Sequence, residues 1–247
     1  AFLEALTTVK KTWHDWFNLQ VQRRQTWVQD WSDHIAAESA TDLAEGRKMH
    51  PLQLGLDVQA AMNDGDWLIF DGGNTHFWNE IGVNIAAKRG LKLGGILHPG
   101  NYSLLGVGVS FAFAAKHIHP EKNAVLITGD GAFLSGGLSI EACFQEKVPI
   151  IVIVDNNGGL DCISQQQERL FENGQHYATD FRDIPFHGMF EGMGGHGELV
   201  TRREDFAPAM QRAIASGKTA CINVKCRGVI SPIVAATSDK REKASIE

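Results

Sequence analysis

Apolar residues recur at steps of three and four near the start of the chain, which is the spacing of a helix. The set is Phe2, Leu6, Val9, Trp13, Trp16, Trp27, Val28, Trp31 and Ile35. We therefore predict a helix over residues 1–36 and a polar linker at residues 39–50. Four of the six Trp residues lie in this helix. Two interpretations stay open: these rings pack on the domain that follows, or they contact a part of the protein outside this chain.

After the linker, short apolar runs alternate with segments of helical spacing. The predicted strands are 66–70, 93–97, 123–128, 148–154, 198–200 and 219–225. The predicted helices are 51–62, 74–88, 104–117, 138–146, 163–171, 184–193 and 204–216. Continuous apolar strands that alternate with helices predict an α/β fold, a doubly wound and mainly parallel sheet with helices on both faces. We divide the chain into a helical linker segment (1–48), an α/β domain (49–227) and a C-terminal tail (228–247).

Composition and charge narrow the class of protein. The chain has 247 residues, of which 43% are hydrophobic, so it can bury a sizeable core. The net charge of −6 argues against a general nucleic-acid binder or a binder of anionic membranes. The apolar runs are far shorter than the roughly 20 residues that cross a bilayer. No leader-like segment is recognisable and reduced thiols suit the four cysteines, so we expect a cytoplasmic protein.

Three glycine-containing turns follow predicted strands, at residues 71–76 (DGGNTH), 129–132 (GDGA) and 155–159 (DNNGG). In parallel sheets, ligands bind outside the carboxyl ends of the strands. Glycine lets backbone amides approach an anion, and Asp and Asn oxygens suit Mg²⁺ beside a diphosphate. Any one of these turns alone is weak evidence, because such residues are common in turns. The chain has neither GxGxxG after its first strand nor GxxxxGK[ST], which disfavours simple dinucleotide-binding and P-loop classes.

The second and third turns resemble the signature of thiamine diphosphate enzymes. Residues 129–131 (GDG), an apolar strand and residues 156–157 (NN) follow the GDG…NN pattern, with Asp130 and Asn157 27 positions apart. From about residue 2 to residue 224, the chain resembles the C-terminal, diphosphate-binding domain of one family. That family comprises acetolactate synthases, 2-oxo acid decarboxylases and 2-hydroxyacyl-CoA lyases.

The resemblance implies a set of cofactor contacts. Asp130, the Asn157 side chain and the Gly159 carbonyl would bind Mg²⁺, and diphosphate oxygens and water would complete its octahedron. Leu105 would lie under the bent cofactor and direct its aminopyrimidine amino group toward thiazolium C2. Without the resemblance, Leu105 would be taken for an ordinary core residue. The other implied cofactor contacts are Asn74, Thr75, the Ser103 carbonyl, Gly129, the Gly131 and Ala132 amides, and Leu160.

The resemblance also implies that this chain holds only half of an active site. In the family, the cofactor ylid adds to a carbonyl and the thiazolium serves as electron sink while a C–C bond breaks. The glutamate that activates the cofactor lies on a separate pyrimidine-binding domain, and residues 2–35 resemble the segment that joins a central domain to this one. We therefore expect a pyrimidine-binding partner, from another chain or from a missing segment, in a dimer or tetramer of such pairs.

After Asn157 the chain departs from acetolactate synthases. Asp161, Cys162 and Gln166 stand where those enzymes have Gly, Met and Trp facing the substrate, which puts acetolactate formation in doubt. Asp161 is either a solvated carboxylate in the first turn of a helix or a group that meets a polar substrate and carries a proton. Residues 98–103 and the C-terminal tail also resemble relatives that act on acyl-CoA thioesters.

Five histidines are candidates for acid–base work: His76, His98, His176, His187 and His196. His76 and His98 lie in turns at the predicted cofactor edge, so we take them, with Leu105 and Asp161, as the candidate catalytic residues. The sequence thus indicates part of a thiamine diphosphate- and Mg²⁺-dependent lyase, decarboxylase or carboligase. Its small-molecule substrate would be a 2-oxo acid or a 2-hydroxyacyl-CoA, with no nucleic-acid or membrane partner. The alternatives are a non-catalytic regulatory or assembly subunit, and a different nucleotide-binding α/β enzyme.

Overall fold

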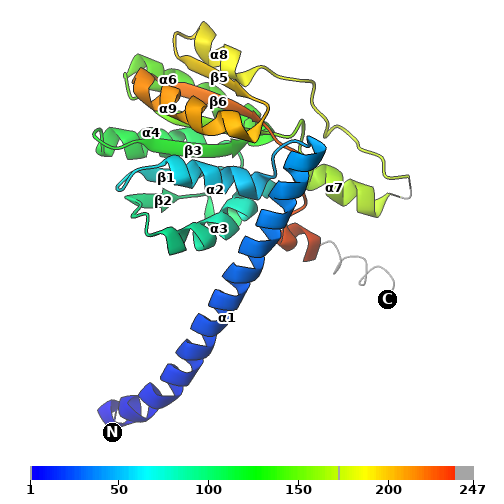
Figure 1. Cartoon of the computed structure of the whole chain (residues 1–247). Coiled ribbons are helices and arrows are strands. Elements are labelled where there is room, and N and C mark those ends of the chain that lie inside the picture. Colours follow the sequence, from blue (N-terminus) through cyan, green and yellow to red (C-terminus); the bar gives the residue numbers. More distant parts are fainter. Residues whose placement is uncertain (1, 172, 237–247) are drawn as a thin grey trace.

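A computed structural model of the chain describes residues 2–171 and 173–236 (Figure 1). Within these residues the strands form a six-stranded sheet in the order β2-β1-β3-β4-β6-β5, and every pairing is parallel. The strands are β1 (Trp67–Phe70), β2 (Gly95–Leu97), β3 (Ala124–Gly129), β4 (Ile151–Asn156), β5 (His196–Val200) and β6 (Ala220–Lys225). None of the described helices has the length and apolar character needed to cross a membrane.

Helices cover both faces of the sheet, which confirms the predicted doubly wound α/β fold. One face carries α2 (Pro51–Ala61) and α9 (Phe206–Ser216), and the other carries α4 (Gly108–Ile118), α5 (Asp130–Gly136), α6 (Glu141–Gln145) and α8 (Phe186–Gly192). Along β1, Leu68 and Phe70 pack in the apolar core under α2 and α9, whereas Ile69 packs in the core on the opposite face, as the two-residue period of a strand requires. Burial on both faces explains why these strands are continuous apolar runs in the sequence.

The remaining helices and turns lie outside these two groups of covering helices. They are α1 (Phe2–Glu45), α3 (Asn74–Ala86), α7 (Asp161–Leu170) and the 3-10 turns η1 (Ala87–Arg89), η2 (Gly100–Tyr102), η3 (Gly137–Ile140) and η4 (Arg203–Asp205). Figure 1 shows α1 leaving the domain as one long helix, with its N-terminal end far from the sheet.

The predicted polar linker is wrong over residues 39–45, where α1 continues to Glu45. The polar side chains there do not end the helix, because several of them bond to the domain. The Ser39 hydroxyl donates to Gln53 Oε1 at 2.7 Å. Asp42 is buried, and its carboxylate lies 3.1 Å from Arg227 Nε. The polar side chains of this segment therefore contact α2 and the residues that follow β6. The connection between α1 and α2 is short.

The tryptophans of α1 divide into two groups: Trp27 lies beside Trp31, with 6.3 Å between ring centroids, and Trp13 lies beside Trp16. Trp31 packs edge-to-face on Trp78 of α3, with 5.6 Å between ring centroids, next to buried Val28. Trp13 and Trp16, farther along the projecting part of α1, are 60% and 54% exposed. Packing on the domain thus explains Trp31. Contact with a part of the protein outside this chain stays a prediction for Trp13 and Trp16.

Some predicted boundaries shift for reasons that glycine explains. The helix predicted over 104–117 begins instead at Gly108, because Gly106 adopts a left-handed conformation with φ +87°. The two glycines are also in close contact: a Cβ on Gly136 would lie 2.1 Å from the carbonyl oxygen of Gly106. The helix predicted over 138–146 is divided between η3 and α6. Helix α5, which was not predicted, lies before them.

The strand order reverses between β1 and β3, and this reversal indicates where along the carboxyl ends of the strands a ligand would bind. From β1 the chain passes to β2 on one side, and then crosses to β3 and β4 on the other. At such a switch point a crevice opens outside the carboxyl ends of the strands. The turns that follow β1, β3 and β4, at residues 71–74, 129–131 and 156–159, therefore share one edge of the sheet.

The two groups of tryptophans predict different responses to truncation. In the 247-residue chain, we expect Trp31→Ala to lower the free energy of unfolding by about 2 kcal/mol, because it empties part of a packed cluster. Trp13→Ala is the matched control, and we expect it to stay within about 0.5 kcal/mol of the parent chain. Urea unfolding followed by circular dichroism measures both values. Equal losses would contradict the assignment of Trp31 to the domain core.

Candidate cofactor site

Asp130 lies at the centre of the crevice, at the start of α5, and is 2% exposed. Its Oδ1 accepts a hydrogen bond from the Gly131 amide at 2.7 Å. Its Oδ2 accepts bonds from the amides of Gly158 and Gly159 at 2.8 and 3.0 Å. One carboxylate thus joins the turn after β3 to the turn after β4. Burial raises the pKa of Asp130 to about 6, although the three amide bonds oppose this shift.

Asn157 and Gly159 lie beside Asp130. Asn157 Oδ1 accepts a bond at 3.2 Å from the Gly159 amide, which also donates to Asp130. Gly159 allows a close approach of two chain segments, because a Cβ at this position would lie 2.4 Å from the Thr179 carbonyl oxygen. The structure therefore brings Asp130, Asn157 and Gly159, the three residues predicted to bind the metal, together. Their role as ligands stays a prediction.

A second buried carboxylate, Asp155, joins β4 to α3. The Thr75 hydroxyl donates to Asp155 Oδ2 at 2.8 Å. Burial, with smaller contributions from the nearby carboxylates of Asp130 and Asp161, raises the pKa of Asp155 to about 7. Three acidic groups are thus crowded at the same edge, and each has a raised pKa. A carboxylate, an amide oxygen and a backbone carbonyl are hard oxygen donors, so the residues present fit a cation such as Mg²⁺.

Asp161 is tied to α3 and to the C-terminal segment. Its Oδ2 accepts a bond from Asn74 Nδ2 at 2.9 Å, and its Oδ1 accepts one from Gln165 Nε2 at 2.8 Å. Asn74 Nδ2 also donates to the Val229 carbonyl at 2.5 Å, and Asn74 Oδ1 accepts from the Ser231 amide at 3.0 Å. Asp161 does lie in the first turn of α7, as one interpretation has it, but its carboxylate is half-buried and bonded to protein groups. Its proposed role as a proton carrier stays a prediction. Burial raises the pKa of Asp161.

These contacts bear directly on two of the predicted phosphate-binding residues. The side chains of Asn74 and Thr75 lie at the crevice, as predicted, but both donate to protein carboxylates. Neither side chain can donate to a phosphate in this arrangement without giving up a protein partner. Residues 229–231 lie against the first turn of α3 at the same place.

Sequence reasoning missed Asp71, which organises the other side of the crevice. Its Oδ1 accepts bonds from the amides of Gly72 and Gly106 at 2.8 and 2.9 Å. Its Oδ2 accepts a bond from the Gly108 amide at 3.1 Å. The carboxylate thus fixes the loop that precedes α4 against the turn after β1. An acidic residue directly after a buried strand, at the ligand-binding edge, is the signal that could have found it.

The loop held by Asp71 carries Ser103 and Leu105. A Cβ on Gly72 would lie 2.5 Å from the Ser103 carbonyl oxygen and 3.0 Å from Leu105 Cδ2, so only glycine permits this approach. Ser103 has a left-handed φ of 48°. Leu105 remains 37% exposed, which is unusual for a core leucine and consistent with a position facing the crevice. On the opposite side, a Cβ on Gly131 would lie 2.4 Å from Leu160 Cδ2.

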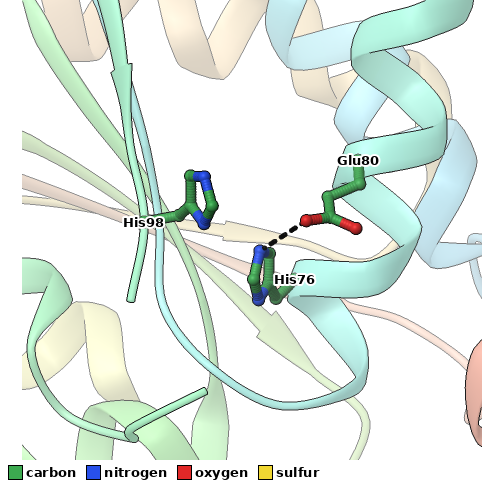
Figure 2. Close-up of side chains that lie close together, drawn as sticks. All are labelled: His76, Glu80 and His98. Atoms are coloured by element: carbon green, nitrogen blue, oxygen red, sulfur yellow. Dashed lines mark ion pairs between the residues drawn. The ribbon is translucent and has the colours of Figure 1, made fainter. Parts of the chain in front are cut away.

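His76 and His98 are neighbours, with 5.0 Å between their ring centroids (Figure 2). His76 is 2% exposed, and its Nε2 lies 3.1 Å from Glu80 Oε1. Burial lowers the pKa of His76, so its imidazole is neutral near pH 7. The other candidate histidines have partners elsewhere: His176 pairs with Glu168 and Asp180, His187 contacts Asn223, and His196 pairs with Glu198.

A cavity of about 1000 Å³ lies between α1, α2 and α9, away from this crevice. Its walls include Met49, Phe206 and Met210, and none of the predicted cofactor residues. Size alone therefore does not identify the ligand site, and the convergent polar groups at the switch point are the stronger indication.

The parallel sheet and its acidic, glycine-rich crevice define an α/β domain that binds a ligand at its switch point. The profile of the family described as "Thiamine pyrophosphate enzyme, C-terminal TPP binding domain" matches residues 71–224. The chain belongs to this family, as the GDG…NN resemblance predicted.

Curated relatives agree with this assignment. The chain is 29% identical over 205 residues to the probable acetolactate synthase of Mycobacterium bovis, covering 79% of this chain and 36% of that protein. It is 26% identical over 191 residues to human 2-hydroxyacyl-CoA lyase 2, covering 73% of this chain and 29% of that protein. The chain thus spans about a third of the length of the curated relatives that it matches.

A solved structure supports the fold. The chain is similar, with a TM-score of 0.63 and 24% identity, to the thiamine diphosphate-dependent 4-hydroxybenzoylformate decarboxylase of Rhodococcus jostii RHA1. The match covers 74% of this chain and 33% of that one.

The raised pKa of Asp130 predicts how stability depends on pH in the absence of divalent cations. The folded state holds a proton that the unfolded chain releases above about pH 4, so this contribution is greatest at low pH. It is lost as pH rises through the folded pKa of about 6. We expect the parent chain to lose up to about 1 kcal/mol per pH unit more than Asp130→Asn over this range. Denaturant unfolding at a series of pH values measures the difference in slope, and parallel slopes would contradict the prediction.

Proposed function

We propose that this chain is the diphosphate-binding part of a thiamine diphosphate- and Mg²⁺-dependent enzyme. The enzyme would cleave or form a C–C bond next to a carbonyl. The observation that supports this most directly is the meeting of Asp130, Asn157 and Gly159 at the switch point. In a member of a thiamine pyrophosphate-binding family, this is the arrangement that a metal-bound diphosphate needs.

Each group at the crevice has a task in this proposal. Asp130, Asn157 and the Gly159 carbonyl hold Mg²⁺, and the cation relieves the repulsion among the crowded carboxylates. The amides of Gly131 and Ala132 would donate to the diphosphate, for which Gly131 would give up its hydrogen bond to Asp130 Oδ1. The Gly129 and Leu160 backbones flank this position on the two turns. Bound thiamine diphosphate supplies the electron sink for C–C bond cleavage.

The loop anchored by Asp71 sets the cofactor's shape. Leu105 supports the cofactor in its bent form, and the Ser103 carbonyl accepts a hydrogen bond from the aminopyrimidine. Asp71 acts as a positioning residue, because it holds this loop through the Gly106 and Gly108 amides. Rigid support of this kind matters because small displacements of a reacting group greatly lower rates.

Cofactor binding would also exchange two side-chain hydrogen bonds. Asn74 and Thr75 turn from Asp161 and Asp155 to phosphate oxygens, and Mg²⁺ compensates the carboxylates that lose these donors. The Asp161 carboxyl then faces the substrate side of the crevice. Because burial raises its pKa, Asp161 holds a proton more readily than an exposed aspartate, which suits a role in proton transfer.

The other half of the site would come from a pyrimidine-binding domain that carries the activating glutamate. The chain's share of its relatives' length, about a third, supports this proposal. The names of those relatives favour a 2-oxo acid or a 2-hydroxyacyl-CoA as substrate. We further propose a dimer or tetramer of such pairs in the cytoplasm. A non-catalytic subunit with the same fold is disfavoured, because the residues that match the family's metal and cofactor contacts, Asp130, Asn157 and Leu105, are intact.

Binding of thiamine diphosphate tests the metal assignment. We expect the intact protein to bind it only with Mg²⁺, and Asp130→Ala to weaken this binding by more than about 100-fold. Protons compete with Mg²⁺ for Asp130, whose pKa is about 6. The apparent Mg²⁺ affinity should therefore rise about tenfold per pH unit below pH 6 and level off above it. Isothermal titration calorimetry measures both effects, and Mg²⁺-independent binding would refute the assignment.

Activity tests the roles of Leu105 and of the missing half-site. In the assembled enzyme, Leu105→Ala should lower kcat by up to about 100-fold, because the cofactor is no longer held in its reactive shape. Leu104→Ala, at an exposed neighbouring position, is the matched control. The 247-residue chain alone should be inactive with 2-oxo acids and 2-hydroxyacyl-CoAs. Turnover by the isolated chain would show that it needs no pyrimidine-binding partner.

A further inference from the structure

We propose that His76, Glu80 and His98 form a binding site for a divalent transition-metal ion such as Zn²⁺, distinct from the Mg²⁺ position. Ligand atoms of the three side chains all lie within 4.8 Å of one another. Figure 2 shows the two imidazoles and the carboxylate facing a common point between α3 and the segment after β2. An ion of this size could draw the three groups together with small side-chain movements.

The fold dictates this convergence. His76 and Glu80 are four residues apart on α3, so they lie one above the other on the same face of the helix. His98 directly follows β2, which pairs with β1, the strand that leads into α3. The ligands thus come from two segments that are neighbours in space and are separated by a crossover in sequence.

His76 gives the second, independent indication of a ligand. It is 2% exposed, yet in the described part of the chain neither of its ring nitrogens has a hydrogen-bond partner. Its Nε2 approaches Glu80 Oε1 to 3.1 Å, but without the alignment of a hydrogen bond. Buried polar atoms without partners are uncommon in native proteins, and an ion is one of the few explanations.

The donor set selects the kind of ion. Two imidazoles and one carboxylate suit Zn²⁺, Co²⁺, Ni²⁺ or Fe²⁺, whereas Mg²⁺ prefers oxygen ligands alone. Burial keeps the pKa of His76 low, so the imidazole is in the neutral form that binds metals. The Glu80 side chain is 44% exposed and supplies one negative charge. The three ligands leave coordination positions open for water.

One existing interaction opposes the ion. The Gly100 amide donates to His98 Nδ1 at 3.1 Å, which fixes the proton on the other ring nitrogen. Whichever nitrogen binds the ion, His98 must give up this hydrogen bond. The bond lies in an exposed turn, where water can satisfy the Gly100 amide instead.

The ion would act as a clamp between two segments of the cofactor site. Edge strand β2 has only three residues and pairs only with β1 among the described strands. The loop that follows it leads to Ser103 and Leu105, and α3 carries Asn74 and Thr75 in the turn that contains His76. A metal ion that joins His98 to α3 would therefore fix the loop of Ser103 and Leu105 relative to Asn74 and Thr75. This consequence depends on the proposed function, whereas metal binding does not.

The test uses the intact protein with every domain it has, stripped by a chelator and resupplied with excess Mg²⁺ and thiamine diphosphate. Zn²⁺ is then titrated, and Co²⁺ is used in parallel because its visible spectrum reports imidazole ligation. His98 is exposed, so His98→Ala is expected to fold. We expect a single tightly bound Zn²⁺ per chain, with affinity lowered by more than about 100-fold in His98→Ala and in Glu80→Gln. Zn²⁺ should raise the Tm of the parent protein and leave that of His98→Ala unchanged.

Two variants serve as controls. His117→Ala removes an exposed histidine from α4 and should retain Zn²⁺. Asp130→Ala should lose thiamine diphosphate but also retain Zn²⁺, so failure of one proposal can be told from failure of the other. Equal Zn²⁺ affinity in the parent and His98→Ala, or no tight Zn²⁺ in any form, would overturn the site. If His98→Ala instead removes one limb of the pH–rate profile without any bound Zn²⁺, the pair is an acid–base pair and the metal proposal is wrong.

Discussion

The crevice depends on one constraint, the burial of the Asp130 carboxylate where strand order reverses. Backbone amides from two different turns supply the hydrogen bonds that its oxygens accept. Those turns must approach within hydrogen-bonding distance of one side chain. Glycine serves this arrangement at two positions: Gly158 has a left-handed φ of +92°, and Gly159 lies so close to the Thr179 carbonyl that a Cβ would not fit.

Asp71 and Asp155 repeat the same solution on either side. Asp71 collects amides from the loop before α4, and Asp155 takes the Thr75 hydroxyl from α3. Asp71 directly follows β1 and Asp155 lies near the end of β4, and each accepts hydrogen bonds from a segment that is distant in the sequence. Desolvation raises the pKa of Asp130 and of Asp155, so the edge stores unfavourable charge that a divalent cation would relieve. The carboxylates that hold the crevice together without a metal are thus the same groups that would surround the proposed Mg²⁺.

The sequence was most informative where a physical period was strong. Apolar strands such as Ile151–Asn156, buried on both faces, were recognisable as a parallel sheet, and the two motifs located its ligand-binding edge. It failed where tertiary contacts override local composition. Residues 39–45 are polar, yet they stay helical because Ser39 and Asp42 bond to the domain. No local pattern could show that Asp71 would gather amides from residues 106 and 108, because that loop reaches it only in the folded chain.

Asn74 shows why the sequence predicts the position of a site residue more easily than its hydrogen-bond partners. Its position was predictable from the motif, but its partners were not: Asp161 lies 87 residues away, and Val229 lies 155 residues away. Both are protein groups that a phosphate would have to replace. An amide side chain that already has good partners gains little from a ligand unless those partners gain something too. Mg²⁺ at the proposed position on Asp130, Asn157 and Gly159 would supply that compensation, because Asp155 and Asp161 interact electrostatically with Asp130. Metal and diphosphate should therefore bind together, each making the other's interactions favourable.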